Sequence, residues 1–188
     1  MGTVKSLLLG MCFVLGACTS QTSTVQTTEK GTQWEWQNGT IVVKTPERPA
    51  GQKSVLGLTT PKLEAVRVGF VGLGMRGPGA VERFTYIPGT QVVALCDYEE
   101  ARADKCQELL KKASMPKAAV YSGDKGYEEL CKRDDIDLVY VAADWLHHFP
   151  VAKCALENGK NVAIEVPSAM NLQECWDLIN LSESTRKH

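Results

Sequence analysis

From residue 66 onward, short apolar runs alternate with segments in which apolar positions recur every three or four residues. The apolar runs predict strands near 66–71, 91–96, 119–121, 137–142 and 161–165. The amphipathic segments predict helices near 77–86, 99–113, 124–132, 150–158 and 171–183. Strands that alternate with helices through short connections are typical of an α/β fold with a doubly wound parallel sheet.

The last predicted helix has a recognisable start and an apolar face. Asn171 stands at the N-cap position and Glu174 follows three residues later, which is the spacing of a capping box. Helical periodicity places one set of side chains on a single face: Leu172, Cys175, Trp176 and Ile179.

Residues 34–64 show a different pattern and predict a hairpin followed by an extended arm. Asn38-Gly39 separates two short β-prone runs, and this dipeptide favours a type I′ turn. Asn38-Gly39-Thr40 also fits a glycosylation sequon, although the turn explains it without a sugar. Residues 44–64 are rich in proline and glycine, and we expect this arm to lie along the domain or to contribute to a binding site.

The N-terminus predicts processing rather than fold. Lys5 precedes an apolar run over 7–15, and Leu15-Gly16-Ala17-Cys18 resembles a bacterial lipobox. We therefore expect residues 1–17 to be a lipoprotein signal peptide and Cys18 to carry lipid, on an exported protein of the cell envelope or periplasm. An ordinary signal peptide with a coincidental cysteine is the alternative. Residues 18–33, rich in Ser, Thr and Gln, predict a flexible tether.

Composition narrows the classes of partner. The 188 residues are 44% hydrophobic and 23% charged, which suffices for one well-buried domain. A net charge of -1 without a basic stripe argues against nucleic acid. No apolar stretch reaches the roughly 20 residues of a spanning helix. We therefore expect membrane contact through the lipid anchor only.

The seven cysteines do not suggest a disulfide framework or a metal site. Removing Cys12 with the signal peptide and Cys18 to the lipid leaves an odd number: Cys96, Cys106, Cys131, Cys154 and Cys175. Each of these lies inside a predicted strand or helix, and no C-x-x-C pair occurs. We interpret them as buried small apolar side chains.

The most informative motif is G-x-G-x-x-G between the first predicted strand and helix. Gly72 permits a tight turn, Gly74 lets the backbone approach a pyrophosphate, and Gly77 allows close helix–strand packing. Asp97 ends the next strand, where its carboxylate can accept two ribose hydroxyls and repel a 2′-phosphate. The pattern predicts a site for NAD in preference to NADP. A glycine-rich turn without ligand is the alternative.

A second group of residues follows the fourth and fifth predicted strands, at the edge where open α/β sheets bind ligands. Trp145 can stack against a flat ring, and His147 or His148 can hydrogen-bond a reacting hydroxyl, with His148 favoured. Helix capping or a solvated surface would also explain adjacent histidines. Glu165 follows the fifth predicted strand, where the alternative to a role in the site is a strand-end carboxylate that only accepts a hydrogen bond. The neighbouring Val166 has no acid–base chemistry.

In their order along the chain, the glycine motif, Asp97, His148-x-Pro150 and Glu165-x-Pro167 resemble the Gfo/Idh/MocA oxidoreductase family. The resemblance implies an N-terminal Rossmann domain over 65–188 and a C-terminal α/β substrate domain that this chain lacks. Dehydrogenases of the family typically have a lysine between the glutamate and the proline. Val166 stands there instead, which departs from simple sugar-alcohol dehydrogenation.

A narrower resemblance is to glycoside hydrolase family 109, on four features: Gly72-Leu73-Gly74-Met75-Arg76-Gly77-Pro78-Gly79-Ala80, Pro49-Ala50-Gly51-Gln52-Lys53-Ser54, Glu165-Val166-Pro167 and the lipobox. It implies NAD as cofactor, with contacts at Met75, Arg76, Asp97, Leu146, His147, His148, Glu165 and Val166. The sugar-contacting residues and the rest of the catalytic machinery are expected beyond His188.

The activity implied by this resemblance is hydrolysis of α-N-acetylgalactosaminides. Hydride leaves the sugar C3, a base removes the C2 proton, the C1 substituent is eliminated, water adds, and the hydride returns, so NAD is recycled. A small-molecule sugar is then the substrate, and a homo-oligomer is left open. The alternatives are an NAD-dependent sugar or inositol oxidoreductase and a non-catalytic sugar-binding lipoprotein.

Overall fold

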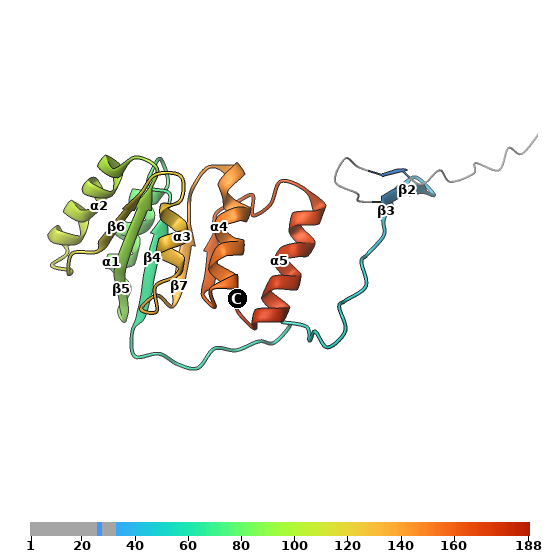
Figure 1. The fold of residues 1–188 in the computed structure, drawn as a ribbon, viewed down its shortest axis with the longest axis horizontal. Coiled ribbons are helices and arrows are strands. Elements are labelled where there is room, and N and C mark those ends of the chain that lie inside the picture. Colours follow the sequence, from blue (N-terminus) through green and yellow to red (C-terminus); the bar gives the residue numbers. More distant parts are fainter. Residues whose placement is uncertain (1–25, 28–32) are drawn as a thin grey trace, which may run out of the picture.

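The computed structural model describes residues 26–27 and 33–188 (Figure 1). The predicted signal peptide and Cys18 lie outside the described residues. Within them, no helix combines the length and apolar character that crossing a membrane requires.

The main body is a five-stranded parallel sheet with the strand order β6-β5-β4-β7-β8. The strands are β4 (Val66–Val71), β5 (Thr90–Asp97), β6 (Ala119–Ser122), β7 (Leu138–Val141) and β8 (Asn161–Ile164). Within this sheet, the first strand along the chain is the central β4, and β5 and β6 follow on one side of it. The chain then returns, and β7 and β8 pair on the other side of β4. This reversal beside β4 confirms the predicted doubly wound α/β sheet of the Rossmann type.

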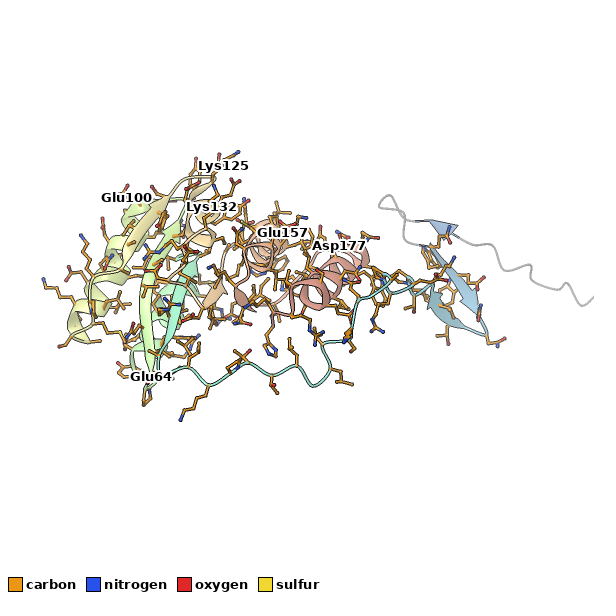
Figure 2. All side chains as sticks on the ribbon, turned by 60° about the horizontal axis from the view of Figure 1, so that its bottom comes forward. Glu64, Glu100, Lys125, Lys132, Glu157 and Asp177 are labelled. Carbon is orange, nitrogen blue, oxygen red and sulfur yellow. The ribbon has the colours of Figure 1, made fainter. Side chains whose placement is uncertain are left out.

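Helices cover both faces of this sheet, since alternate residues of each strand point to opposite sides. One core lies under α1 (Gly77–Thr85) and α2 (Glu100–Lys112) and contains Val68, Phe70 and Leu95. The other lies under α3 (Gly126–Cys131) and α4 (Trp145–Glu157) and contains Val71, Ala94 and Val141. Figure 2 shows charged side chains such as Glu100 and Glu157 on the helices.

The last helix, α5 (Leu172–Thr185), packs against α4 and begins as predicted. Asn171 Oδ1 accepts the Glu174 N–H at 3.0 Å. The Glu174 carboxylate accepts from the Met170 N–H at 2.7 Å, one residue before the N-cap of the predicted box. The predicted face of α5 is only partly covered, because Leu172, Cys175 and Ile179 are exposed.

The arm over 44–64 contains no helix or strand and lies along α5 (Figure 1), which is one of the two predicted placements. Arg48 donates two hydrogen bonds, at 2.8 and 3.0 Å, to the buried carboxylate of Glu183. Gln52 Nε2 donates to the Asn180 carbonyl at 2.6 Å, and Arg186 Nη1 donates to the Lys53 carbonyl at 2.7 Å. The arm is thereby held at the far end of the domain before it reaches β4.

Before the arm, β2 (Gln33–Gln37) and β3 (Thr40–Val43) form the predicted hairpin. Asn38 and Gly39 have φ values of 50° and 78°, as a type I′ turn requires. A short strand, β1 (Gln26–Thr27), pairs with β2 inside the region predicted as tether. Backbone pairing thus gives part of that region local structure despite its polar composition.

The largest difference from the sequence prediction is the start of α4. The helix expected over 150–158 begins five residues earlier, at Trp145. Asp144 caps it, since its Oδ1 accepts the Leu146 N–H at 3.0 Å. Pro150 therefore lies inside the helix and does not start it. This earlier start places His147 and His148 in the first turn of α4.

Candidate functional site

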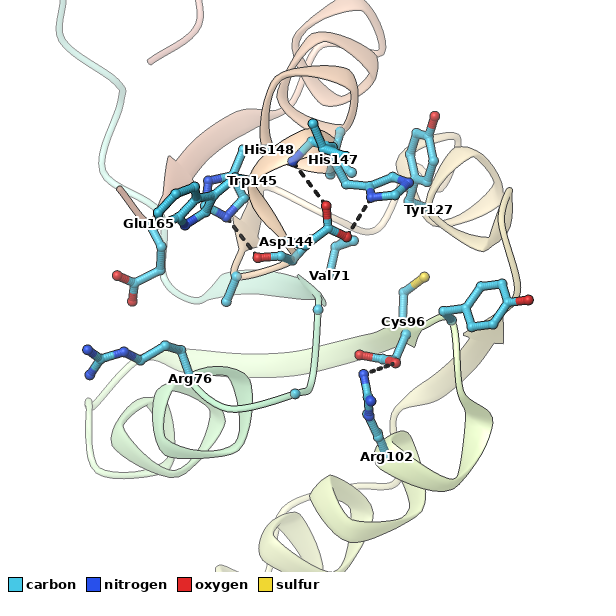
Figure 3. Close-up of a pocket in the computed structure, with 18 of the residues that line it drawn as sticks. Val71, Arg76, Cys96, Arg102, Tyr127, Asp144, Trp145, His147, His148 and Glu165 are labelled. Carbon is cyan, nitrogen blue, oxygen red and sulfur yellow. Dashed lines mark hydrogen bonds and ion pairs between the residues drawn. The ribbon is translucent and has the colours of Figure 1, made fainter. Parts of the chain in front are cut away.

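A cleft of about 1210 Å³ opens at the carboxyl ends of the strands, beside the point where strand order reverses (Figure 3). Its walls are the β4–α1 turn, the end of β5, the start of α4 and the end of β8. It contains all but one of the predicted cofactor-contacting residues: Gly72, Gly74, Met75, Arg76, Asp97, Trp145, Leu146, His147, His148, Glu165 and Val166. Gly77, the remaining one, begins α1 behind the turn.

Two of the three motif glycines are required by the packing of the protein itself. Gly72 has a φ of +91°, and a Cβ there would lie 2.2 Å from the Ala143 amide nitrogen. A Cβ on Gly77 would lie 2.2 Å from the Gly72 carbonyl oxygen. Both distances are far below van der Waals contact. These glycines therefore fix the turn against the start of the β7–α4 connection and against α1.

Gly74 has no such requirement. A Cβ there would meet only Arg102 Nη1, at 3.6 Å, and its φ is not in the left-handed region. The N-terminus of α1 behind it has no side-chain cap and no acidic residue in its first turn. The first amide groups of a helix lack acceptors within the helix and favour an anion. The space above Gly74 therefore fits a pyrophosphate, which gives this glycine a function that the fold alone does not.

Asp97 is 5% exposed and supports the same turn. Its Oδ2 accepts the Leu73 N–H at 2.6 Å, and its Oδ1 accepts the Glu99 N–H at 3.0 Å. Arg102, from the first turn of α2, pairs with Oδ1 at 3.2 Å. The carboxylate therefore already holds the glycine turn, and its predicted contact with ribose hydroxyls has to share these lone pairs.

Cys96 and Tyr127 line the side of the cleft below α3. Burial, followed by the charge of Asp97, raises the pKa of the Cys96 thiol to about 12, so this cysteine stays protonated. Burial also raises the pKa of Tyr127, with the Glu128 charge adding to it. Neither group is suited to give up a proton at neutral pH.

Asp144 and His147 are hydrogen-bonded at the start of α4, with Oδ2 and Nδ1 2.6 Å apart. Partial burial would raise the pKa of Asp144, but the bond to His147, the charge of that ring and two backbone N–H groups lower it below its usual range. The pair leaves His147 Nε2 directed away from Asp144. In Figure 3 the ring of His147 turns toward the α3 side of the cleft, where Tyr127 lies.

His148, predicted as an acid or base, is buried between two backbone carbonyl groups. It is 1% exposed, and its Nδ1 lies 2.7 Å from the Pro167 carbonyl oxygen. Its Nε2 lies 3.0 Å from the Ala143 carbonyl oxygen. Both nitrogens face acceptors, so this geometry offers neither to a substrate and gives the acid–base prediction no support. His148 connects the start of α4 to the segment after β8.

Glu165 and Val166 directly follow β8, on the opposite side of the cleft from α3 (Figure 3). Glu165 Oε1 accepts a hydrogen bond from the Tyr140 hydroxyl at 2.7 Å. Burial and this bond raise the pKa of Tyr140, which keeps the hydroxyl a donor. Val166 is 84% exposed at the mouth of the cleft. The hydrogen bond from Tyr140 therefore supports the interpretation of Glu165 as a strand-end carboxylate. Val166 presents an apolar surface to the cleft.

The cleft also contains residues that were not predicted from the sequence, among them Arg102, Tyr127 and Asp144. Arg102 follows Asp97 by five residues at a helix start, a spacing that carries little information without the structure. Asp144 was identifiable as an N-cap residue, but only once α4 begins at Trp145. Tyr127 reaches the cleft from α3 through the packing of that helix, and no local signal indicates this.

Comparison with protein families agrees with this geometry. Residues 66–188 match the model of the Gfo/Idh/MocA oxidoreductase family, described as having an NAD-binding Rossmann fold. The matched range begins at β4 and includes every strand and helix around the cleft.

Similar proteins carry a more specific name. Glycosyl hydrolase family 109 protein 4 of Phocaeicola vulgatus is 79% identical over 100% of this chain. Glycosyl hydrolase family 109 protein 1 of Bacteroides thetaiotaomicron is 56% identical over 98% of it. The chain spans 37% and 38% of the lengths of these two relatives.

Solved structures share the fold at lower identity. Myo-inositol dehydrogenase from Lactobacillus casei, in complex with NAD(H) and myo-inositol, is 25% identical with a TM-score of 0.55, over 64% of this chain and 34% of that chain. A mutant of a 3-ketoreductase from Actinomadura kijaniata, in complex with TDP-benzene and NADP, is 25% identical with a TM-score of 0.56, over 65% of this chain and 37% of that chain. The domain is an NAD-binding Rossmann domain, and neighbours of this fold hold either NAD or NADP in their crystals.

Proposed function

Because this chain belongs to the Gfo/Idh/MocA oxidoreductase family, with its NAD-binding Rossmann fold, we propose that the protein is an NAD-dependent glycoside hydrolase acting on α-N-acetylgalactosaminides. The observation that carries the proposal is the 79% identity, over the whole chain, to a relative named for glycosyl hydrolase family 109. The cleft above Gly74 supports it, because its shape and uncapped helix N-terminus suit a dinucleotide.

The residues of this chain would bind and orient the cofactor. The N-terminus of α1 and the bare Gly74 backbone hold the pyrophosphate, and Asp97 holds a ribose while it fixes the turn. When bound, NAD supplies a hydride acceptor for the sugar C3 and returns the same hydride at the end of the cycle. The base for the C2 proton and the sugar-contacting residues are proposed to follow His188.

Val166 favours this hydrolase over a simple dehydrogenase. It occupies the position where, by resemblance, dehydrogenases of the family have a lysine that acts on the substrate hydroxyl. An exposed valine at the mouth of the cleft moves no proton. Val166→Lys in the full-length protein should therefore lower glycosidase activity by crowding the site. Substrate-dependent accumulation of NADH in this variant would count against the proposal.

A conventional NAD-dependent sugar or inositol oxidoreductase is the second candidate, favoured by the fold shared with myo-inositol dehydrogenase. The two activities differ in their net redox change. A dehydrogenase accumulates NADH absorbance in proportion to substrate consumed, whereas the recycling hydrolase releases the aglycone without net NADH.

The decisive experiment incubates the full-length protein with a chromogenic α-N-acetylgalactosaminide and follows aglycone and NADH together. We expect aglycone release that continues over many turnovers without net NADH. The 188-residue chain, assayed in parallel, should show no hydrolysis, since positioning by the substrate domain can supply about 7–11 kcal/mol of the barrier. Stoichiometric NADH would identify the oxidoreductase. The absence of both aglycone and NADH is the outcome expected of a binding protein.

The proposal includes an exported lipoprotein that acts at the cell envelope, supported by the lipobox that ends in Cys18. A mass spectrum of the mature N-terminus should show lipid on Cys18, and Cys18→Ser should abolish it. A mature N-terminus that starts elsewhere would refute the anchor without touching the enzymatic proposal.

A further inference from the structure

Tyr140, in the middle of β7, belongs to an aromatic cluster in the core under α1 and α2. Its ring packs against Phe70 and Phe84, with ring centroids 5.3 and 5.6 Å away. The rings of Phe70 and Phe84 also meet each other, at 5.2 Å. Because three rings that pack on one another leave little room for rotation, the Tyr140 hydroxyl is held in one place.

The register of β7 and β8 brings this hydroxyl to Glu165. Tyr140 pairs with Ala163, and Glu165 follows Ala163 by two residues, on the same face of the sheet. The Glu165 N–H donates to the Val141 carbonyl at 3.0 Å, which continues the pairing with β7 beyond the end of β8. The Tyr140 hydroxyl donates to Glu165 Oε1 at 2.7 Å. Both the backbone and the carboxylate of Glu165 are therefore fixed by β7.

The charge of Glu165 differs from that of the other carboxylates in the cleft in how it is held. Asp97 pairs with the Arg102 guanidinium, and Asp144 is hydrogen-bonded to the His147 ring. Glu165 is held by an uncharged hydroxyl, and it forms no ion pair within the part of the chain that the structure describes. Its negative charge is therefore available to a ligand in the cleft that it lines.

The position of Glu165 corresponds to the nicotinamide half of the cofactor. In a doubly wound sheet a dinucleotide lies across the reversal of strand order, with one half over each half of the sheet. Asp97 marks the adenosine half at the end of β5, and the Gly74 turn lies at the crossing. The nicotinamide half should therefore extend toward the ends of β7 and β8. Figure 3 shows Glu165 on the opposite side of the cleft from Cys96, the neighbour of Asp97.

We propose that Tyr140 is a positioning residue that holds the Glu165 carboxylate at the nicotinamide end of the cleft, where its negative charge favours NAD⁺ over NADH. The nicotinamide ring is cationic in NAD⁺ and neutral in NADH, while the rest of the cofactor is the same. A fixed negative charge near that ring therefore acts on the difference between the two forms. This inference rests on the NAD site and holds whether the whole protein is a glycosidase or an oxidoreductase.

Arg76 is the opposing charge to consider, because it also lines the cleft. It is exposed on the β4–α1 turn, beside the space assigned to the pyrophosphate. The pyrophosphate has the same charge in NAD⁺ and in NADH. Arg76 should therefore strengthen the binding of both forms, whereas Glu165 should distinguish between them.

The test titrates the cofactor-free full-length protein calorimetrically with NAD⁺ and, separately, with NADH. Glu165→Gln keeps the size of the side chain and the oxygen that accepts from Tyr140, but it removes the charge. We expect this variant to lower the preference for NAD⁺ over NADH by about tenfold. Tyr140→Phe keeps the aromatic cluster and releases the carboxylate, so the preference should fall by about threefold.

Two further variants separate positioning from a general loss of structure. Tyr121→Phe is the matched control, since the Tyr121 hydroxyl accepts a hydrogen bond from Arg133 Nη1 at 3.2 Å and does not line the cleft. It should leave the preference unchanged even if it costs stability. In the double variant, Tyr140→Phe should have no further effect on the preference beyond Glu165→Gln, because it acts only through the carboxylate.

An unchanged preference in Glu165→Gln would overturn the role of the charge. If Tyr140→Phe weakened NAD⁺ and NADH binding equally, or lowered the preference again in the Glu165→Gln background, Tyr140 would not be a positioning residue for this carboxylate. The rise in melting temperature on addition of NAD⁺ or NADH reports the same preference, so a variant of reduced stability can still be judged. None of these ratios depends on glycosidase activity.

Discussion

The two walls of the cleft are built differently. On the β4–α1 wall, backbone meets backbone: Gly72 packs on Ala143, Gly77 packs on Gly72, and the buried Asp97 fastens the turn. On the α4–β8 wall, large apolar side chains stand exposed: Trp145, Leu146 and Val166. The turn of the first wall is fixed by contacts within this chain, although Met75 stands exposed beside it, whereas the second wall presents mainly side-chain surface that further contacts can cover.

This contrast separates what holds the fold from what holds a ligand. A residue whose replacement collides with backbone belongs to the fold, even inside a cofactor motif. For a residue that faces open space, the ligand that binds there determines which side chain fits. The following experiments test this separation in order of decreasing expected effect.

Gly72→Ala should cause the largest loss of stability, about 3 kcal/mol or more, because it combines a strained backbone with a collision against Ala143. Urea unfolding measures it. Gly123→Ala is the matched control: Gly123 has a similar φ of +80°, but a Cβ there meets nothing within 4 Å. Equal losses in the two variants would show that backbone strain, and not packing on Ala143, governs the turn.

Gly74→Ala should leave unfolding almost unchanged and weaken NAD binding by tenfold or more, about 1.4 kcal/mol. Its Cβ meets no protein atom closer than 3.6 Å, so the added methyl group occupies the space assigned to the pyrophosphate. Calorimetric titration with NAD measures the affinity. Unchanged affinity would place the pyrophosphate elsewhere.

Asp97→Ala should narrow the preference for NAD over NADP by about tenfold, since it removes the charge that repels a 2′-phosphate and frees Arg102. The ratio of the two dissociation constants is the quantity to measure, because loss of the Leu73 and Glu99 hydrogen bonds also costs stability. Glu99→Gln, which removes the other carboxylate paired with Arg102, is the control. Equal affinity for both cofactors in the unmutated protein would contradict the role of Asp97.

Much of the fold follows from local pattern. The strand, glycine turn, helix and acid over 66–97 are contiguous, so periodicity and turn chemistry suffice to predict them. The hairpin at Asn38-Gly39 and the cap at Asn171 are local for the same reason. The start of α4 was missed because Pro150 is the stronger local signal, while the cap that decides the start is Asp144.

The remaining features depend on distant contacts, which no local pattern contains. The Pro167 carbonyl oxygen lies 2.7 Å from the ring of His148, so the histidine predicted as a base is also a buried connector between two segments. The arm reaches α5 through Arg48 and Glu183, which are 135 residues apart.

Asp144→Asn should have the smallest effect, at most about 1 kcal/mol at neutral pH, because the pair with His147 is largely exposed. The folded-state pKa of Asp144 is depressed, so its contribution is present above the unfolded value of about 4 and is lost as pH falls through the folded value. The stability gap between wild type and variant should therefore close below about pH 4. Glu108→Gln, at an exposed carboxylate of α2, controls for general loss of charge, and a gap that persists in acid would contradict the pairing.

The attachment of the arm to α5 has a mechanical consequence. Tension applied to the N-terminal side of the chain enters the fold at the Arg48–Glu183 ion pair and the Gln52 contact, at the end of the domain remote from β4. These few bonds lie in series ahead of the central strand. A pull would peel the arm from α5 before any strand of the sheet bears the force, so the cleft is shielded from strain transmitted through the leading segment.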